Sequence, residues 1–292
     1  MNEPTSTSND PVPRVSVIIP TLDGHRGGRV PHLLETVRRQ TFTDYEVLLI
    51  RGVSPQGRAI NQGARQAKGE ILLILDDDSA LAEDTVFERL VATLDADPRI
   101  GMAGASIVLA PDATPFERCA AEQFPRFNTP RVDVVTDSDL ACHGCCAFPR
   151  PIFEAIGGER EDMLRGLDPD LRVRLREAKY RVVLVPGATI YHPLPGNWSG
   201  LLRIFFRNGY GSAYAQRFQP NQVYETHESL NDAGFQPRTS LGYRLLRFPL
   251  RLLKALFEGK TLRFGAYCAY AVGYGWGWIT AREIPRESRP KA

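Results

Sequence analysis

The sequence predicts an α/β fold built on a parallel sheet, because short apolar runs alternate with helical segments through the first two hundred of its 292 residues. Runs of about five apolar, often β-branched residues are typical of strands buried on both faces. A repeated strand, helix, strand order places such strands side by side with right-handed crossovers. With 43% hydrophobic and 24% charged residues, the chain can fold as one large domain or two unequal ones.

The predicted elements begin with a strand over residues 15–19, an apolar and β-branched run that Pro20 closes. Pro31 then opens an amphipathic helix. The apolar side of this helix carries Leu33, Leu34 and Val37. Further patterns predict strands over residues 46–50, 71–75, 100–109 and 181–185 and a helix from Thr85 to Asp97. Pro186 and Gly187 close the last strand.

Three consecutive carboxylates, Asp76, Asp77 and Asp78, directly follow the predicted strand at residues 71–75. In open α/β sheets, ligands bind in the crevice beyond the carboxyl ends of the strands. Adjacent negative charges repel one another, so a hard cation such as Mg²⁺ or Mn²⁺ would stabilise this arrangement. The alternative is a charged turn that leads into the helix at residues 85–97.

Asp168 is a second candidate for chemistry. Because Pro169 suits the first position of a helix, the sequence predicts Asp168 as the N-cap of a helix that runs to about Ala178. The residues expected to face inward are Leu171, Leu175 and Ala178. A carboxylate held at a helix start can also take a proton from an acceptor hydroxyl, and the spacing alone leaves both interpretations open.

The five cysteines are an odd number, and the N-terminal residues 1–13 are polar, without the apolar core of a signal peptide. We therefore expect a reduced, cytosolic protein. Residues 142–146 contain one C-x-x-C pair and His143. No second pair with matching spacing follows, so the sequence favours packed thiols in a loop over a zinc site.

Four motifs resemble, in order, those of the family 2 glycosyltransferases: residues 15–21, 38–42, 61–70 and the Asp76–Asp78 triplet. The likeness continues to Tyr191 and His192 and covers roughly residues 14–195. The resemblance implies the GT-A fold, a single mixed α/β domain flanked by helices. It also implies transfer of a sugar from a nucleotide diphosphate, with inversion at the anomeric carbon and Mg²⁺ or Mn²⁺ as cofactor.

The resemblance also implies roles for single residues. Asp76 and Asp78 are the outer members of the D-x-D motif, with Asp76 near the ribose and Asp78 on the metal. Asp77 lies between them, beside the nucleotide sugar. Asp168 corresponds to the general base, and His192 to a histidine near the metal or the diphosphate. Further residues implied in donor binding are Pro20, Thr21, Asp23, Arg58 and Asn61.

The sequence departs from the family pattern at two places. The family usually carries an acidic pair after the second strand, where an Asp accepts a hydrogen bond from the base. This chain has Arg51 there, and arginine is a donor only, which disfavours a UDP donor. The base is then read by backbone groups or by Asp23. Leu167 replaces the Glu that often precedes the catalytic Asp.

The C-terminal part differs in charge from the rest. Residues 201–292 carry 14 Lys and Arg against 6 Asp and Glu, a net of +8, which leaves residues 1–200 at −6. A helix with Arg203, Arg207 and Arg217 is expected to flank the acceptor side. Residues 243–260 predict a basic amphipathic helix that either lies on an anionic membrane or docks on the catalytic domain with solvated cations.

Residues 262–280 are apolar and aromatic but contain four glycines and an arginine. We expect this segment to insert at the membrane interface rather than to span the bilayer. Membrane contact is thus predicted for residues 244–280. No nucleic-acid-binding module accompanies the basic residues, which disfavours a nucleic-acid partner.

These expectations give three parts: a disordered tail at residues 1–13, a GT-A catalytic domain at 14–200, and a basic helical extension at 201–292. The predicted function is sugar transfer to a hydroxyl of a membrane-associated acceptor, on the inner face of the cell membrane, in glycolipid or polysaccharide assembly. One alternative is a polyprenyl-phosphate glycosyltransferase, which needs no general base. Another is a non-catalytic scaffold subunit; Arg51 and Leu167 favour it, and the retained carboxylates argue against it.

Overall fold

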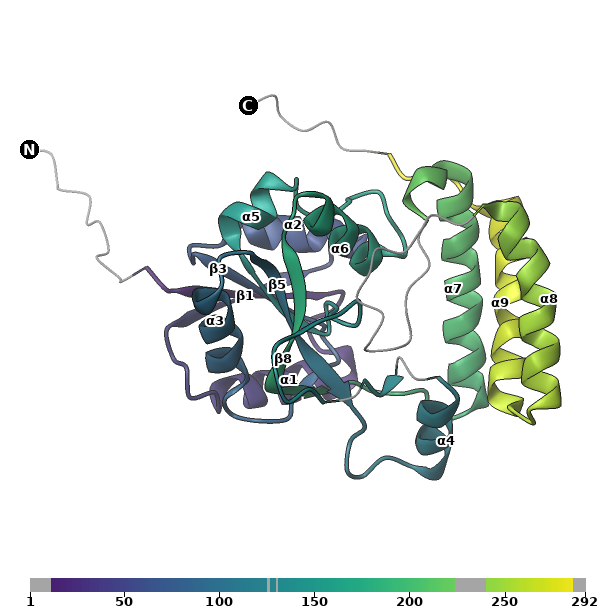
Figure 1. Ribbon diagram of the computed structural model, residues 1–292, viewed down its shortest axis with the longest axis horizontal. Coiled ribbons are helices and arrows are strands. Elements are labelled where there is room, and N and C mark those ends of the chain that lie inside the picture. Colours follow the sequence, from purple (N-terminus) through teal and green to yellow (C-terminus); the bar gives the residue numbers. More distant parts are fainter. Residues whose placement is uncertain (1–11, 125–126, 130, 224–239, 286–292) are drawn as a thin grey trace, which may run out of the picture.

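The computed structural model describes residues 12–124, 127–129, 131–223 and 240–285. Most of the predicted tail, residues 1–11, lies outside the described residues. A central sheet with helices on both faces forms the first part of the chain, and long helices lie side by side at one end of it (Figure 1).

Within the described residues, the sheet has eight strands in the order β2-β1-β3-β7-β5-β8-β4, with β6 beside β8. It is mixed, as the family resemblance implied, because β7 runs antiparallel to both β3 and β5 while β1, β2 and β3 are mutually parallel. The strands are β1 (Val15–Thr21), β2 (Tyr45–Arg51), β3 (Ile71–Leu75), β4 (Ala80–Leu81), β5 (Ile100–Val108), β6 (Thr136–Asp137), β7 (Cys145–Pro149) and β8 (Arg181–Tyr191). The expectation of a parallel sheet was therefore wrong at β7, which begins at Cys145, inside the cysteine cluster that the sequence predicted as a loop.

Both faces of the sheet are covered by helices, which explains why all five residues of β3 are buried. On one face, Leu33 and Phe87 belong to a core cluster that α1 (Arg29–Arg38) and α3 (Val86–Ala96) share with the sheet. On the other, Ile60 and Leu171 join a second cluster from α2 (Gln56–Gln66), α5 (Arg150–Ala155) and α6 (Leu167–Glu177). Packing in the two clusters fixes the position of β3 and therefore the position of Asp76–Asp78, which follow it.

The C-terminal helices are α7 (Trp198–Phe218), α8 (Leu241–Phe257) and α9 (Thr261–Thr280). They confirm the predicted helical extension. Glycines bring α7 and α9 close together: a Cβ on Gly273 would lie 2.0 Å from the carbonyl oxygen of Phe206. The helix α8 packs on the outer side of α9 (Figure 1). A short helix, α4 (Pro115–Gln123), contacts α9.

Several local predictions were wrong. Pro20 does not close the first strand, which continues through it to Thr21, and α1 begins at Arg29 rather than at Pro31.

The last long strand does not stop at Pro186 but continues to Tyr191, because pairing with β5 resumes at Ser106 and Thr189 after an irregularity in register. Proline is tolerated at such irregularities because no ladder hydrogen bond is needed there.

A further error concerns the start of α6. The residue before this helix is Gly166, with φ of 89°, and Asp168 lies inside the first turn rather than at the N-cap. The Asp168 carboxylate bonds to His143 instead of to its own helix. Leu171 and Leu175 are buried as expected, but Ala178 is exposed at the helix end.

Candidate active site

The residues at the carboxyl ends of β3 and β8 form a group with the geometry of a metal site. Asp76, Asp78 and His192 each offer a ligand atom, and these atoms all lie within 4.8 Å of one another. The His192 Nε2 atom is 3.3 Å from an Asp78 oxygen and 4.0 Å from an Asp76 oxygen. Two carboxylates and an imidazole suit Mn²⁺ and Mg²⁺ in charge and donor type. Within the described residues, no other group of three such side chains has this spacing.

Burial and mutual repulsion perturb the carboxylates of this group. Desolvation raises the pKa of Asp76 to about 6; the charge of Asp78 adds to this effect and that of His192 opposes it. Desolvation also raises the pKa of Asp77, against a hydrogen bond with Thr21 and the positive charge of Arg26. A cation bound here would relieve the repulsion between Asp76 and Asp78.

Arginines from the segment after β1 lie against the same carboxylates. Arg26 contacts Asp78 at 2.7 Å and Asp77 at 3.3 Å, and Arg29 lies 3.9 Å from Asp78. Arg26 has a φ of 50°, and its backbone N–H donates to the Asp23 carboxylate at 2.7 Å. Arg26 was not among the predicted site residues; the run of basic residues and glycines after Asp23 is the signal that could have revealed it.

Asp168 is held by His143. The His143 backbone N–H donates to the Asp168 Oδ1 atom at 2.8 Å, and the His143 Nδ1 atom lies 2.9 Å from the same oxygen. On its other side, His143 Nε2 lies 2.8 Å from a Glu159 oxygen, and both side chains are buried. Asp168 keeps partial exposure, with 32% of its side chain accessible. A fixed carboxylate that remains open to solvent can accept a proton from a bound hydroxyl.

The charges of these three residues support one another. Burial alone would raise the pKa of Asp168, but the charge and hydrogen bonds of His143 lower it below its usual range. Burial would lower the pKa of His143, but Asp168 and Glu159 raise it well above its usual value. Both shifts favour an ion pair between the Asp168 carboxylate and the His143 imidazolium. The roles of His143 and Glu159 were not predicted, because in the sequence His143 stands out only as a member of the cysteine cluster.

The two parts of the site meet at Asp76. Its backbone N–H donates to the carbonyl oxygen of His143 at 3.1 Å, and its carboxylate accepts a hydrogen bond from Gln56 at 2.7 Å. The negative charge of Asp168 also contributes to the raised pKa of Asp76. The candidate metal ligands and the candidate base thus lie on neighbouring segments at one edge of the sheet.

Four of the other predicted donor-binding residues lie at the same edge. Pro20 and Thr21 end β1, and the Thr21 hydroxyl accepts a hydrogen bond from the Gly24 N–H at 3.2 Å. Asp23 lies in the following turn, where it also accepts from the His25 N–H at 2.8 Å. Asp77, 7% exposed, lies beneath Arg26.

The side chains of Asn61 and Arg58 are engaged within the protein. The buried Asn61 amide accepts from the Glu159 N–H at 2.8 Å and donates to the Glu159 carbonyl at 2.9 Å. Asn61 therefore fixes the backbone of the residue that contacts His143. Arg58 donates to the carbonyl oxygen of Pro285 at 3.3 Å. Arg51, the departure from the family pattern, lies under the loop after β1, where a Cβ on Gly24 would be 2.6 Å from its Nε atom.

The cysteine cluster is part of the core. Cys145 and Cys146 are buried in β7, so the expectation of packed thiols is confirmed. The expectation of a loop is wrong for these two residues, whereas Cys142 lies in the loop before β7. All five cysteines are free. Burial raises the pKa of the Cys142 thiol to about 11, which disfavours the thiolate that a zinc ion would need.

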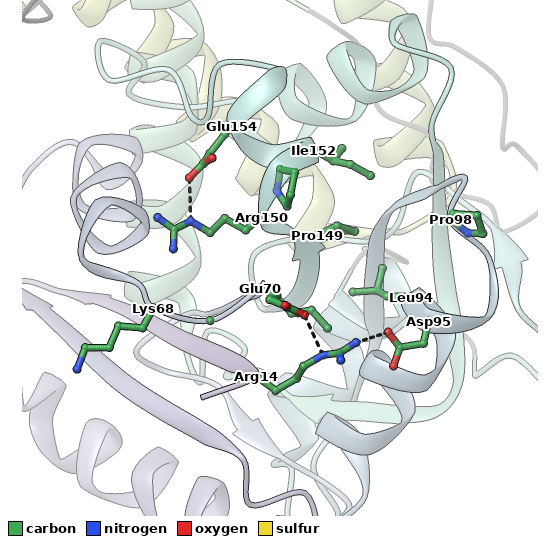
Figure 2. Close-up of a pocket in the computed structure, with 13 residues that line it drawn as sticks. Arg14, Lys68, Glu70, Leu94, Asp95, Pro98, Pro149, Arg150, Ile152 and Glu154 are labelled. Atoms are coloured by element: carbon green, nitrogen blue, oxygen red, sulfur yellow. Dashed lines mark hydrogen bonds and ion pairs between the residues drawn. The ribbon is translucent and has the colours of Figure 1, made fainter. Parts of the chain in front are cut away.

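A cleft of about 690 Å³ lies at the opposite edge of the sheet, where β1 and β3 begin (Figure 2). Its arginines pair with carboxylates: Arg14 with Glu70 and Asp95, and Arg150 with Glu154. The cleft lacks the clustered carboxylates of the candidate site, and its arginines are already neutralised. We do not place the donor there.

A mixed sheet of this order, with an acidic triplet after β3, defines a protein of the GT-A class of glycosyltransferases. The sequence profile described as glycosyltransferase-like family 2 matches residues 7–211. The chain belongs to this family.

Individual relatives are more distant. An uncharacterized glycosyltransferase of Haemophilus influenzae is 30% identical over 109 residues, which span 30% of this chain and 36% of that protein. The chain thus matches about a third of the length of this relative.

Among solved structures, a mannosyltransferase from Pyrobaculum calidifontis, in complex with GDP-Man and Mn²⁺, aligns with a TM-score of 0.56 and 20% identity, over 90% of this chain and 87% of that one. This likeness confirms the GT-A-like fold. GalNAc-T7 with UDP, GalNAc and Mn²⁺ aligns with a TM-score of 0.49 and 16% identity, over 73% of this chain and 52% of that one.

Proposed function

We propose that this protein is a metal-dependent, inverting glycosyltransferase that moves a sugar from a nucleotide diphosphate to a hydroxyl group of a membrane-associated acceptor. The observation that carries the proposal is the pairing of two groups at one sheet edge: Asp78 with His192, and Asp168 with His143. The first group suits a divalent ion, and the second presents an ionised carboxylate to solvent. Together, the two groups can stabilise the charge on the leaving diphosphate and accept the proton of the attacking hydroxyl.

In this mechanism the residues have separate tasks. Asp78 and His192 would hold the divalent ion, which supplies positive charge to the departing diphosphate. Asp168 takes the proton of the acceptor hydroxyl as its oxygen bonds to the anomeric carbon and the bond from that carbon to the diphosphate breaks. His143 keeps the Asp168 carboxylate oriented. A single displacement of this kind inverts the anomeric centre.

The donor is tested by calorimetric titration of the full chain with GDP-, UDP- and dTDP-sugars, each with and without Mn²⁺. We expect one donor to bind in a manner that depends on Mn²⁺, and UDP-sugars to bind more weakly because Arg51 replaces an acidic residue that would accept from the base. Failure of every donor to bind with Mn²⁺ present would contradict the proposed function.

The acceptor is proposed to lie at a membrane because α8 turns an apolar stripe outward. Leu246, Leu250, Leu253 and Phe257 recur at helical spacing and are 71%, 62%, 48% and 84% exposed. The apolar stripe of a helix in a globular protein normally faces the core, so its exposure indicates an interaction surface. The opposite side of α8 packs on α9, with Phe248 against Tyr267 and Tyr270.

The helix α9 extends the same kind of surface. Val272, Trp276 and Ile279 are 64%, 56% and 78% exposed and lie at positions i, i+4 and i+7. Cations accompany the stripe on α8, among them the exposed Lys254. Apolar side chains flanked by cations favour an anionic lipid surface.

Within the described residues, no helix is long and apolar enough to cross a bilayer. The inner face of the cell membrane suits five free thiols.

The membrane contact is tested with the double variant Leu250→Gln, Phe257→Gln. Full burial of each apolar side chain contributes about 1.5–3 kcal/mol, so we expect partitioning onto vesicles of phosphatidylglycerol and phosphatidylcholine to fall about tenfold or more. The matched control is Val134→Gln, at a residue 70% exposed on a different part of the chain. Equal sedimentation of the double variant and the wild type with vesicles would contradict membrane contact, and a loss of self-association would identify a dimer surface instead.

A further inference from the structure

Two arginines from different parts of the chain meet the same face of α7, one helical turn apart, near the candidate base. Arg165 belongs to the loop before α6, and Arg207 lies in the middle of α7. The side chain of Arg165 lies against α7 at Gly211, where a Cβ would be only 2.3 Å from the Arg165 Cγ atom. Gly211 and Arg207 are one helical turn apart and share a face of α7. The absence of a side chain at Gly211 therefore lets Arg165 reach the face that carries Arg207.

Electrostatic interactions connect Arg165 both to Arg207 on α7 and to the candidate active site. Desolvation lowers the pKa of Arg165, the charge of Arg207 lowers it further, and the charges of Asp76 and Asp168 raise it. Arg165 is thus within electrostatic range of Arg207 on one side and of the catalytic carboxylates on the other. Both arginines remain exposed to solvent.

The pair has an excess of positive charge. Among the described residues, no carboxylate forms a salt bridge with either guanidinium, although most other arginines near the site are paired, such as Arg174 with Asp170. Two cations held together in this way repel each other, and a bound anion would remove the repulsion. Planar guanidinium groups bind phosphate in a bidentate manner, which makes a phosphate group the best chemical match.

We propose that Arg165 and Arg207 bind a phosphate group carried by the acceptor substrate, a proposal that rests on the proposed function. Arg165 precedes Asp168 by three residues and interacts with its charge, so a group bound to Arg165 lies within reach of the base. Arg207 belongs to α7, which packs along α9 and so joins the site to the proposed membrane surface. The donor diphosphate is expected near Asp78, where Arg26 already supplies positive charge. A lipid-linked acceptor with a phosphate between its lipid and its reactive hydroxyl fits this arrangement.

The test compares Arg165→Ala and Arg207→Ala with the wild-type full chain in three binding titrations. The probes are farnesyl phosphate, farnesol, and GDP or UDP with Mn²⁺. We expect the wild type to bind farnesyl phosphate about tenfold or more tightly than farnesol, and each variant to lose most of this difference, as for the loss of a charge-assisted hydrogen bond. Farnesol and nucleotide binding should stay within about twofold of the wild type.

The matched control is Arg38→Ala, which removes an exposed arginine from α1. Thermal melting of all variants reports whether the fold is retained, and Arg165→Lys and Arg207→Lys keep the charge without the planar fork. The proposal is overturned if the wild type binds farnesyl phosphate no better than farnesol, if the alanine variants leave farnesyl phosphate binding unchanged, or if they weaken nucleotide binding instead. Absence of nucleotide binding by the wild type overturns the proposed function alone, because the farnesyl phosphate arm still reports on the arginines.

Discussion

Asp168→Asn is expected to lower the rate of sugar transfer by about 10² or more, the usual contribution of a general base. Asparagine keeps the shape of the side chain but cannot take the proton of the acceptor hydroxyl. The contacts of Asp168 with the His143 backbone and ring explain why a neutral replacement should still fold, since a hydrogen bond from the backbone can persist. The measurement is transfer of radiolabelled sugar, from the donor selected by calorimetry, into a lipid extract.

The control for this variant is Glu154→Gln, which neutralises an exposed carboxylate beside Arg150 at the opposite edge of the sheet. It should transfer sugar at the wild-type rate. Turnover of Asp168→Asn close to that of the wild type would exclude a hydroxyl acceptor that needs a base, and would favour an acceptor that is itself a phosphate. Donor binding should be the same in both variants, so a loss of binding would point to damage of the fold rather than of the chemistry.

Local sequence patterns were sufficient to predict the strands and helices that depend only on the burial and spacing of neighbouring residues. The strand at residues 71–75 and the helix that begins near Thr85 occur as predicted, because buried apolar runs and amphipathic spacing report directly on burial. The triplet Asp76–Asp78 follows its strand at the ligand-binding edge for the same reason: a parallel strand that ends there carries the next residues into the crevice.

Features that depend on distant partners were not predicted. The strand β7 is short, and only its pairing with β3 and β5 distinguishes it from a loop. Asp168 was expected to cap its own helix, but it bonds to His143, 25 residues away in the chain. The contact of Arg26 with Asp78 joins residues 52 apart. Sequence spacing carries no information on such pairs, because they form only when the sheet brings separate loops to one edge.

The second large effect is expected at the candidate metal site. Asp78→Asn removes one anionic ligand from a group whose members lie within 4.8 Å of one another. Changes even in residues behind metal ligands lower metal affinity by about 10–100-fold, so loss of a ligand should weaken Mn²⁺ binding by about 100-fold or more. Sugar transfer should fall by about 10² or more as well, because the charge that stabilises the leaving diphosphate is no longer held in place. Calorimetric titration with Mn²⁺ and the transfer assay measure the two effects.

Arg26→Ala is the matched variant, and it should act in the opposite direction on the metal. Its guanidinium lies 2.7 Å from the Asp78 carboxylate and competes there with a divalent ion. Because Arg26 is about half exposed, the ion pair contributes only about 0.2–1 kcal/mol, and its removal should strengthen binding of Mn²⁺ alone by no more than about fivefold. Opposite shifts in the two variants would locate the ion at Asp78, since both act on the same carboxylate. Equal Mn²⁺ affinity in Asp78→Asn and the wild type would show instead that the acidic triplet is a charged turn, held by Arg26 rather than by a metal ion.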